Sequence, residues 1–201
     1  MASLQDFMIS RVRVKLLKIF FDNPREMYYV RQLTRMTEEE INAVRRELRR
    51  MEKSLMIKHE RRGNRIYYYV SFAYDFFEDL LSLVTKSTGI GLGLRNNRKK
   101  LGKVKFAMLS GKFVRRKERT SSDVDLLVVG DIVIPELTIL VQAEEARRKT
   151  EINYTVMTEE EFLFRKNRRD PFLLSILSTS RVMIIGDEEG LVDKSVTEEA
   201  A

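Results

Sequence analysis

The chain has 201 residues, of which 43% are hydrophobic and 33% charged, a composition typical of folded proteins with heavily charged surfaces. This length suffices for one large domain or two small ones. No apolar run reaches the roughly 18–20 residues that cross a bilayer, and the N-terminus lacks the basic-then-apolar pattern of a secretory signal. Without cysteine there are neither disulfides nor thiolate metal sites, and a single histidine (His59) excludes a histidine-rich metal site. We therefore expect a soluble, cytoplasmic protein with no membrane partner.

The net charge of +7 is unevenly distributed along the chain. Residues 1–72 contain 16 Lys and Arg against 9 Asp and Glu, whereas the remaining residues contain 21 of each kind. All of the excess positive charge therefore lies in the first third of the sequence. This asymmetry indicates a module that binds a polyanion, joined to an electrostatically neutral module.

Three helices are expected in residues 11–55. The first is a mostly apolar stretch that stops at the breaker cluster 22–24, and the second fits residues 29–35. Thr37 followed by Glu40 matches a capping box, so the third helix is predicted to open there. Apolar residues recur in it at spacings of three and four, which predicts a buried face formed by Ile41, Val44, Leu48, Met51 and Leu55.

The opposite face of the third helix is basic, and a basic hairpin is predicted to follow it. A helix in the DNA major groove needs long cations for phosphates and an Arg or Asn that can read base edges. In residues 57–70, two strand-like runs flank a Gly-Asn pair that suits a tight turn. The candidate DNA-binding residues are Asn42, Arg45, Arg46, Arg49 and Arg50 on the helix, and Arg61, Arg62, Asn64 and Arg65 on the hairpin.

This order of elements resembles the winged helix-turn-helix of bacterial and archaeal transcription regulators. The resemblance covers residues 9–72 and rests on VRVKLLKIFFDNP, YYVRQLTRM, INAVRRELRRMEKSLMI and KHERRGNRIYYYV. It implies an α+β fold that binds double-stranded DNA. It also implies a homodimer, because such regulators commonly pair to read two half-sites.

Residues 73–102 are expected to form a helical connector. The aromatic-rich stretch 72–84 has helical spacing and fits either a dimer seam or plain packing between two domains. The following GIGLGL lacks the strand-turn-helix setting and the spacing of a dinucleotide loop, so we do not interpret it as a cofactor site. We expect a hinge there, followed by a basic helix over residues 95–101.

The C-terminal module is predicted to fold as an α/β domain with a mixed sheet over residues 103–190. Strands are expected at 104–109, 124–129, 152–157 and 181–185. Helices are expected at 136–149, 159–165 and 171–177. The acidic end, residues 191–201, is expected to be a disordered tail.

Two carboxylates stand at the start of the strand expected at 124–129. Asp123 and Asp125 are two residues apart, so their side chains point the same way from a strand. Such a pair can hold Mg²⁺ between the protein and nucleotide phosphates. Glu151, which directly precedes the strand expected at 152–157, is the best-placed third carboxylate by sequence.

This region resembles the minimal nucleotidyltransferase domain of the DNA polymerase beta superfamily. The family motif is a Gly-Ser that ends one strand, followed by an Asp-x-Asp that opens the next. The resemblance implies that Asp123, Asp125 and Glu151 are catalytic and that Asp123 and Asp125 bind Mg²⁺. It also implies that Gly111 and Lys112 contact a nucleoside triphosphate. The family's serine is replaced by Lys112, and the glycine that follows it by Arg116.

Because of Lys112, the sequence does not decide whether this site is catalytically active. Lys112 could neutralise a phosphate, or it could pair with Asp123 or Asp125 and occupy the metal site. Turnover, ligand binding without turnover and a purely structural remnant are all compatible with these residues.

The sequence as a whole therefore favours a two-domain, DNA-binding transcription regulator. The nucleotidyltransferase-like domain would serve as a sensor, a dimerisation unit or a residual enzyme. The alternative is a Mg²⁺-dependent nucleotidyltransferase that acts on a protein or small molecule and is localised by its DNA-binding domain. A third hypothesis is an antitoxin-like or interaction role of the neutral domain.

Overall fold

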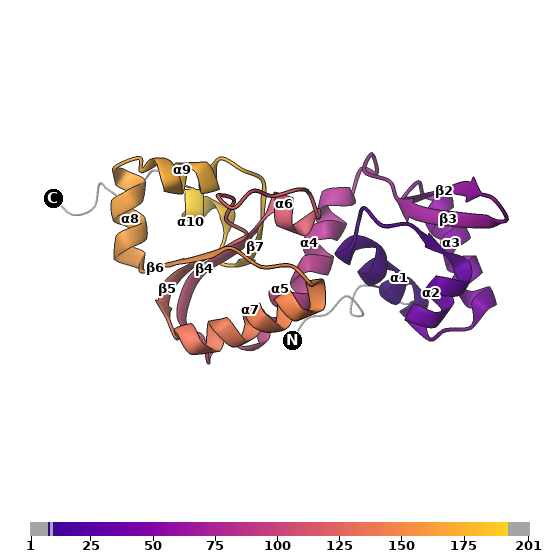
Figure 1. Cartoon of the computed structure of the whole chain (residues 1–201), viewed down its shortest axis with the longest axis horizontal. Helices are drawn as coiled ribbons and strands as arrows, with labels where there is room; N and C mark the ends of the chain where they lie inside the picture. Colours follow the sequence, from indigo (N-terminus) through magenta and orange to yellow (C-terminus); the bar gives the residue numbers. More distant parts are fainter. Residues whose placement is uncertain (1–7, 9, 193–201) are drawn as a thin grey trace. The chain divides into compact units, whose positions relative to one another are not determined.

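The computed structural model describes residue 8 and residues 10–192 (Figure 1). Contacts between Cα atoms divide the chain into two compact units, residues 1–88 (unit 1) and residues 89–201 (unit 2). Over the described residues the fold is α+β, with ten helices, a small antiparallel sheet and a four-stranded mixed sheet. None of the helices in these described ranges has both the length and the apolar character needed to cross a membrane.

The described residues of unit 1 form four helices and a three-stranded antiparallel sheet of strand order β1-β3-β2. The predicted helices and hairpin are present, with bounds shifted by a few residues. A two-residue strand, which was not predicted, precedes the second helix because Tyr29 pairs with Tyr67 of the hairpin. The elements are α1 (Arg11–Asp22), β1 (Tyr28–Tyr29), α2 (Val30–Thr37), α3 (Ile41–Lys53), β2 (Ile57–Arg62), β3 (Arg65–Val70) and α4 (Phe77–Ser87).

The buried face of α3 is confirmed over most of its predicted length. Val44, Leu48 and Met51 are at most 1% exposed and belong to the core of unit 1. The prediction for Leu55 was wrong, since this residue is 69% exposed. The helix ends at Lys53, and Leu55 adopts a left-handed backbone with φ of +61°, which takes it off the helical stripe.

The predicted capping box at the start of α3 was also wrong. Thr37 is the last residue of α2, and its hydroxyl donates a hydrogen bond back to the Leu33 carbonyl at 2.8 Å. Glu40 caps α3 instead, because its carboxylate accepts from the backbone N–H of Ala43 at 2.9 Å. The turn between the two helices passes through Glu38, which has a φ of +54°. The third helix therefore opens four residues later than Thr37.

The hinge predicted at GIGLGL is a helix, α5 (Gly89–Asn96). Ile90 and Leu94 lie four residues apart and are both buried, so they form one apolar helix face. The basic helix predicted over residues 95–101 was wrong as well, because α5 ends at Asn96 and turns follow it. The predicted connector is thus divided: α4 clusters with unit 1 and α5 with unit 2.

Unit 2 contains a mixed sheet, as predicted, and its strand order is β6-β5-β4-β7. β5 and β6 run parallel, whereas β4 is antiparallel to both β5 and β7. The elements after α5 are β4 (Gly102–Ser110), α6 (Gly111–Val114), β5 (Leu126–Ile132), α7 (Ile134–Arg148), β6 (Tyr154–Met157), α8 (Glu159–Asn167), α9 (Pro171–Leu177), β7 (Arg181–Ile185) and α10 (Glu188–Val192).

Helices cover both faces of this sheet (Figure 1), with α5 and α7 on one face and α8, α9 and α10 on the other. Alternate strand residues serve the two faces; Leu127 and Val129 pack with Phe162 of α8 in one apolar cluster. The prediction of disorder from residue 191 was wrong at its start, because Leu191 is buried at the end of α10. The rest of the predicted tail, residues 193–201, lies outside the described residues.

Candidate functional site

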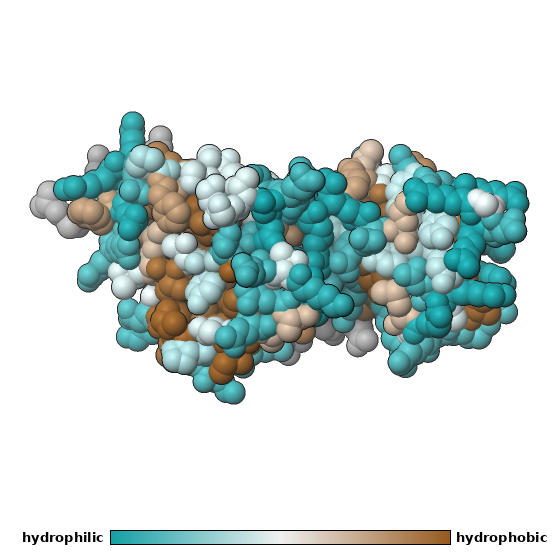
Figure 2. Space-filling view, viewed as in Figure 1, coloured by the Kyte–Doolittle hydropathy of each residue, from teal (hydrophilic) through white to brown (hydrophobic). Residues whose placement is uncertain are grey.

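The basic face of α3 is exposed to solvent, as predicted. All of its candidate DNA-binding residues are exposed, while the opposite face of the helix is buried in unit 1. In Figure 2 the surface over α3 and the β2–β3 hairpin is largely hydrophilic. These exposed residues are Asn42, Arg45, Arg46, Arg49 and Arg50.

A buried glutamate on the same helix distinguishes Arg50 from the others. The Glu47 carboxylate is 6% exposed; one oxygen accepts from Arg13 Nε of α1 at 2.9 Å and the other from Arg50 Nη1 at 2.7 Å. Burial raises the pKa of Glu47, but the hydrogen bond and charge of Arg13 and the hydrogen bond of Arg50 outweigh it, so the net pKa is lowered. Glu47 thus stays ionised, ties α3 to α1 and offsets part of the Arg50 charge. Sequence reasoning missed this role because it depends on a contact across 34 residues.

The β2–β3 hairpin presents its charged residues at an exposed tip. Arg62 pairs with Arg65 in the strand register, which leaves a two-residue turn of Gly63 and Asn64. Gly63 has a φ of +58°, a conformation that glycine adopts without strain. The four predicted contact residues, Arg61, Arg62, Asn64 and Arg65, are all exposed. Arg62 also forms an ion pair with Glu60.

A groove of about 920 Å³ lies between α2, α3 and the hairpin. Arg35 of α2 donates to the Tyr29 hydroxyl at 3.0 Å, and the Arg65 guanidinium lies 4.8 Å from the centre of the Tyr29 ring. The lining contains five arginines and no carboxylate. It consists of Tyr29, Val30, Arg31, Thr34, Arg35, Arg45, Arg49, Asn64, Arg65, Ile66 and Tyr68.

Sequence reasoning missed the contribution of α2 to this groove. Arg31 and Arg35 are exposed and four residues apart, so they lie on one face of α2. In the sequence, this four-residue spacing was the signal for a second basic helix face. Tyr68, on β3, also lines the groove, and burial together with Glu52 raises its pKa against the opposing effect of Arg49 and Arg45. Its hydroxyl therefore stays protonated at neutral pH and can donate a hydrogen bond.

In unit 2, the Asp123 carboxylate is paired with Lys112. Lys112 Nζ lies 2.7 Å from Asp123 Oδ1, and Asp123 Oδ2 accepts from the backbone N–H and the hydroxyl of Thr120 at 2.8 and 3.1 Å. The hydrogen bond from Lys112, and then that from the Thr120 N–H, lower the pKa of Asp123 to about 2. Both carboxylate oxygens therefore already have donors from the chain itself.

The Asp125 carboxylate is fully buried and forms an ion pair with Arg119. The same oxygen, Oδ2, also accepts from the backbone N–H of Asn153 at 3.0 Å. Its other oxygen, Oδ1, is buried and has no hydrogen-bond partner among the described residues. The backbone N–H of Asp125 donates to the Asn153 carbonyl at 2.7 Å, which fixes the residue at the edge of β6.

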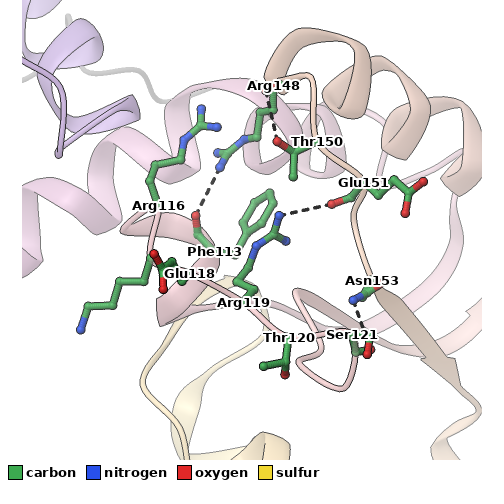
Figure 3. A pocket seen from close by; sticks show the side chains of 11 residues that line it. Phe113, Arg116, Glu118, Arg119, Thr120, Ser121, Arg148, Thr150, Glu151 and Asn153 are labelled. Atoms are coloured by element: carbon green, nitrogen blue, oxygen red, sulfur yellow. Dashed lines mark hydrogen bonds between the residues drawn. The ribbon is translucent and has the colours of Figure 1, made fainter.

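Glu151 is not grouped with the other two carboxylates. Its backbone carbonyl accepts from Arg119 Nη2 at 3.3 Å, and Figure 3 shows its carboxylate pointing away from that guanidinium. In the part of the chain that the structure describes, no group of three or more His, Cys, Asp or Glu could hold a metal ion. The structure thus places Asp123 and Asp125 beside separate cations and leaves Glu151 exposed.

Gly111, the candidate nucleotide contact, is packed against the start of β7. Its backbone N–H donates to the Ser180 carbonyl at 2.6 Å. A Cβ at this position would meet Ser180 Oγ at 2.0 Å, so the glycine is required by close packing. This N–H is therefore already engaged within unit 2.

A pocket of about 610 Å³ lies next to these residues (Figure 3). The Phe113 ring lies 5.4 Å from the guanidinium of Arg119 and 4.0 Å from that of Arg148. Arg148 is in turn paired with Glu144, which is 3% exposed. Buried carboxylates thus balance both guanidinium groups at the ring. The lining is Phe113, Arg116, Lys117, Glu118, Arg119, Thr120, Ser121, Arg148, Thr150, Glu151 and Asn153.

The arrangement of Asp123 and Asp125 does not fit Mg²⁺. This ion requires nearly octahedral oxygen ligands at about 2.0–2.1 Å. Here only Asp125 Oδ1 lacks a donor, and that oxygen is shielded from solvent. The carboxylates of Asp123 and Asp125 are also already compensated by a lysine and an arginine.

None of the family models, curated proteins or solved structures compared with this chain matches it. The likenesses to winged-helix regulators and to nucleotidyltransferases therefore rest on motifs and on the order of elements.

Proposed function

We propose that unit 1 binds duplex DNA and that the protein is a DNA-binding transcription regulator. The observation that carries this proposal is the groove between α2, α3 and the hairpin, lined by five arginines and by no carboxylate. A surface of this kind attracts a polyanion, and the phosphate backbone supplies most of the affinity of DNA-binding proteins.

Helix α3 is the best candidate for the element that enters the major groove. The B-DNA major groove admits an α-helix, and Arg and Asn side chains can each form bidentate hydrogen bonds with base edges. Asn42, Arg45 and Arg49 are exposed on one side of α3. Arg45 and Arg49 also line the groove, whereas Arg50 is engaged by Glu47. We therefore expect base contacts from Asn42, Arg45 and Arg49.

The hairpin and α2 are suited to hold the sugar-phosphate backbone on either side of α3. Arg65 and Arg35 both contact Tyr29, which restrains their side chains before DNA arrives. Restrained side chains lose less conformational entropy on binding. These contacts would set orientation, while α3 would set sequence preference.

Binding of the full chain to a labelled random-sequence duplex tests this proposal. Fluorescence anisotropy is measured between about 50 and 200 mM salt, where each phosphate contact contributes about 0.9 to the slope of log K against log salt. We expect Arg35→Ala with Arg65→Ala, which removes two of the proposed backbone contacts, to lower that slope by about one to two and to weaken binding at least about tenfold.

Lys99→Ala with Lys100→Ala is the matched control, because it removes two exposed charges from unit 2. This control should bind nearly as the wild type does. Absence of duplex binding at low salt, or an equal loss in both double variants, would overturn the proposal. Sequencing of the genomic fragments bound by the protein then tests the regulatory role, for which enrichment upstream of transcribed genes is expected.

A further inference from the structure

The Asp-x-Asp pair of unit 2, Asp123 and Asp125, is separate from the proposed DNA-binding groove of unit 1. In a nucleotidyltransferase these carboxylates would face divalent metal, as the resemblance implies. Here each carboxylate meets a cation of the same chain: Lys112 at Asp123 and Arg119 at Asp125.

We propose that Lys112 and Arg119 are built-in cations that replace the metal ion at the Asp-x-Asp pair, so that this site of unit 2 is closed and metal-independent. The lysine comes from α6 and the arginine from the loop between α6 and β5. Together they supply the two positive charges that one divalent ion would bring.

The distribution of hydrogen bonds supports this replacement. Asp123 accepts from Lys112 through Oδ1 and twice from Thr120 through Oδ2. Asp125 accepts from Arg119 and from the Asn153 N–H through a single oxygen. Three of the four carboxylate oxygens are therefore occupied, which is too few free ligands for a hard cation that prefers oxygen.

Because Asp125 is buried, its carboxylate needs a positively charged partner, whether that is a side chain or a metal ion. Its side chain is 0% exposed, and a buried carboxylate without a counter-charge is strongly destabilising. Arg119 is itself only 18% exposed, and a divalent ion would have to displace it and leave a guanidinium without its carboxylate. Retention of Arg119 is therefore favoured over exchange for metal.

The same two pairs fasten the loop that links α6 to β5. Arg119 donates to the Glu151 carbonyl, and the Asn153 side chain donates to the carbonyls of Ser121 and Asp123 at 3.4 and 3.3 Å. The loop is thus attached to the segment before β6. In this arrangement the carboxylates serve to hold the loop closed.

Titration of the full chain with Mn²⁺, followed by electron paramagnetic resonance and thermal unfolding, tests the proposal without any assay of activity. We expect the wild type to show no site that depends on Asp123 and no rise in Tm. Lys112→Ser should bind Mn²⁺ at least about tenfold more tightly than the wild type, because a like charge a few ångströms from the metal is removed. This gain should disappear in Lys112→Ser with Asp123→Asn.

Lys117→Ser is the matched control, because it removes an exposed lysine from the loop that follows α6. It should behave as the wild type does. Lys112→Ser keeps the buried Arg119–Asp125 pair and is expected to fold, which circular dichroism checks. Mn²⁺ binding by the wild type that is lost in Asp123→Asn would overturn the proposal. So would equal titration curves for the wild type and folded Lys112→Ser.

The outcome of the Mn²⁺ titration is independent of DNA binding, because every substitution used in it lies in unit 2. The anisotropy measurements with duplex DNA report on unit 1. A failure of either proposal is therefore recognised separately from a failure of the other.

Discussion

Glu47→Gln removes a single negative charge at the point where α3 is held against α1, with almost no change in side-chain size. The wild-type carboxylate is 6% exposed and accepts from Arg13 and Arg50 at 2.9 and 2.7 Å. A hydrogen bond to a charged group contributes about 1.5–3 kcal/mol when it is well formed. Arg13 and Arg50 are 36% and 64% exposed, so solvent screens both interactions. We therefore expect the free energy of unfolding of unit 1 to fall by about 1–2 kcal/mol.

Thermal and urea unfolding of the full chain, followed by circular dichroism, measures this loss. A unit of this size loses about 4–8 °C in Tm for each kcal/mol, so a decrease of roughly 5–15 °C is expected. Glu38→Gln is the control, because it neutralises an exposed glutamate at the end of α2. The control should stay within about 0.5 kcal/mol of the wild type.

DNA affinity separates the structural role of Glu47 from a role in recognition. Below the unfolding transition, Glu47→Gln should bind duplex DNA at least as tightly as the wild type. The substitution removes a negative charge from α3 and releases Arg50 from its partner. An unchanged Tm would refute the inference that Glu47 holds α3 against α1. Weaker DNA binding by the folded variant would refute the view that Glu47 offsets part of the Arg50 charge.

Two further predictions concern unit 2. The pKa of Asp123 is lowered to about 2, so its pairing contributes stability above the unfolded value near 4 and loses it as the pH falls through about 2. As the pH is lowered from 5 to 2, the free energy of unfolding in urea should therefore fall by about 1 kcal/mol less for Lys112→Met than for the wild type. Parallel curves of unfolding free energy against pH would contradict this. Gly111→Ala should destabilise the protein by about 1–3 kcal/mol in thermal unfolding, because its Cβ would lie 2.0 Å from Ser180 Oγ. The control Gly93→Ala meets only an ordinary contact at 3.5 Å and should be neutral or stabilising, and equal effects of the two substitutions would contradict the packing role of Gly111.

The basic face of α3 and the hairpin could be predicted from the sequence because both follow from local periodicity. Val44, Leu48 and Met51 repeat at helical spacing, and arginines fill the positions between them. The share of α2 in the groove could not be predicted in this way. Arg31 and Arg35 join the groove through the pairing of β1 with β3, a contact between segments about 40 residues apart.

Helix α5 shows where local propensity misleads. Three glycines in six residues predict a flexible segment, because each glycine costs a helix about 1 kcal/mol relative to alanine. Ile90 and Leu94 are nevertheless buried, and Gly93 leaves only ordinary van der Waals space beside Leu140 of α7. Close packing of α5 on α7 therefore compensates for the poor propensity, and such compensation is visible only in the folded unit.

The Asp-x-Asp pair shows a related limit, in which a motif defines ligands but not what they bind. Two carboxylates two residues apart call for positive charge, and a sequence motif does not say whether metal or side chains supply it. Lys112 could be recognised as unusual from its position after Gly111, but nothing in its neighbours indicated which carboxylate it would meet. Arg119 was one of several basic residues in a polar loop, and only the fold brings its guanidinium to the fully buried Asp125. At this pair, the donors that already occupy three of the four carboxylate oxygens therefore argue against a metal ion more directly than the motif argues for one.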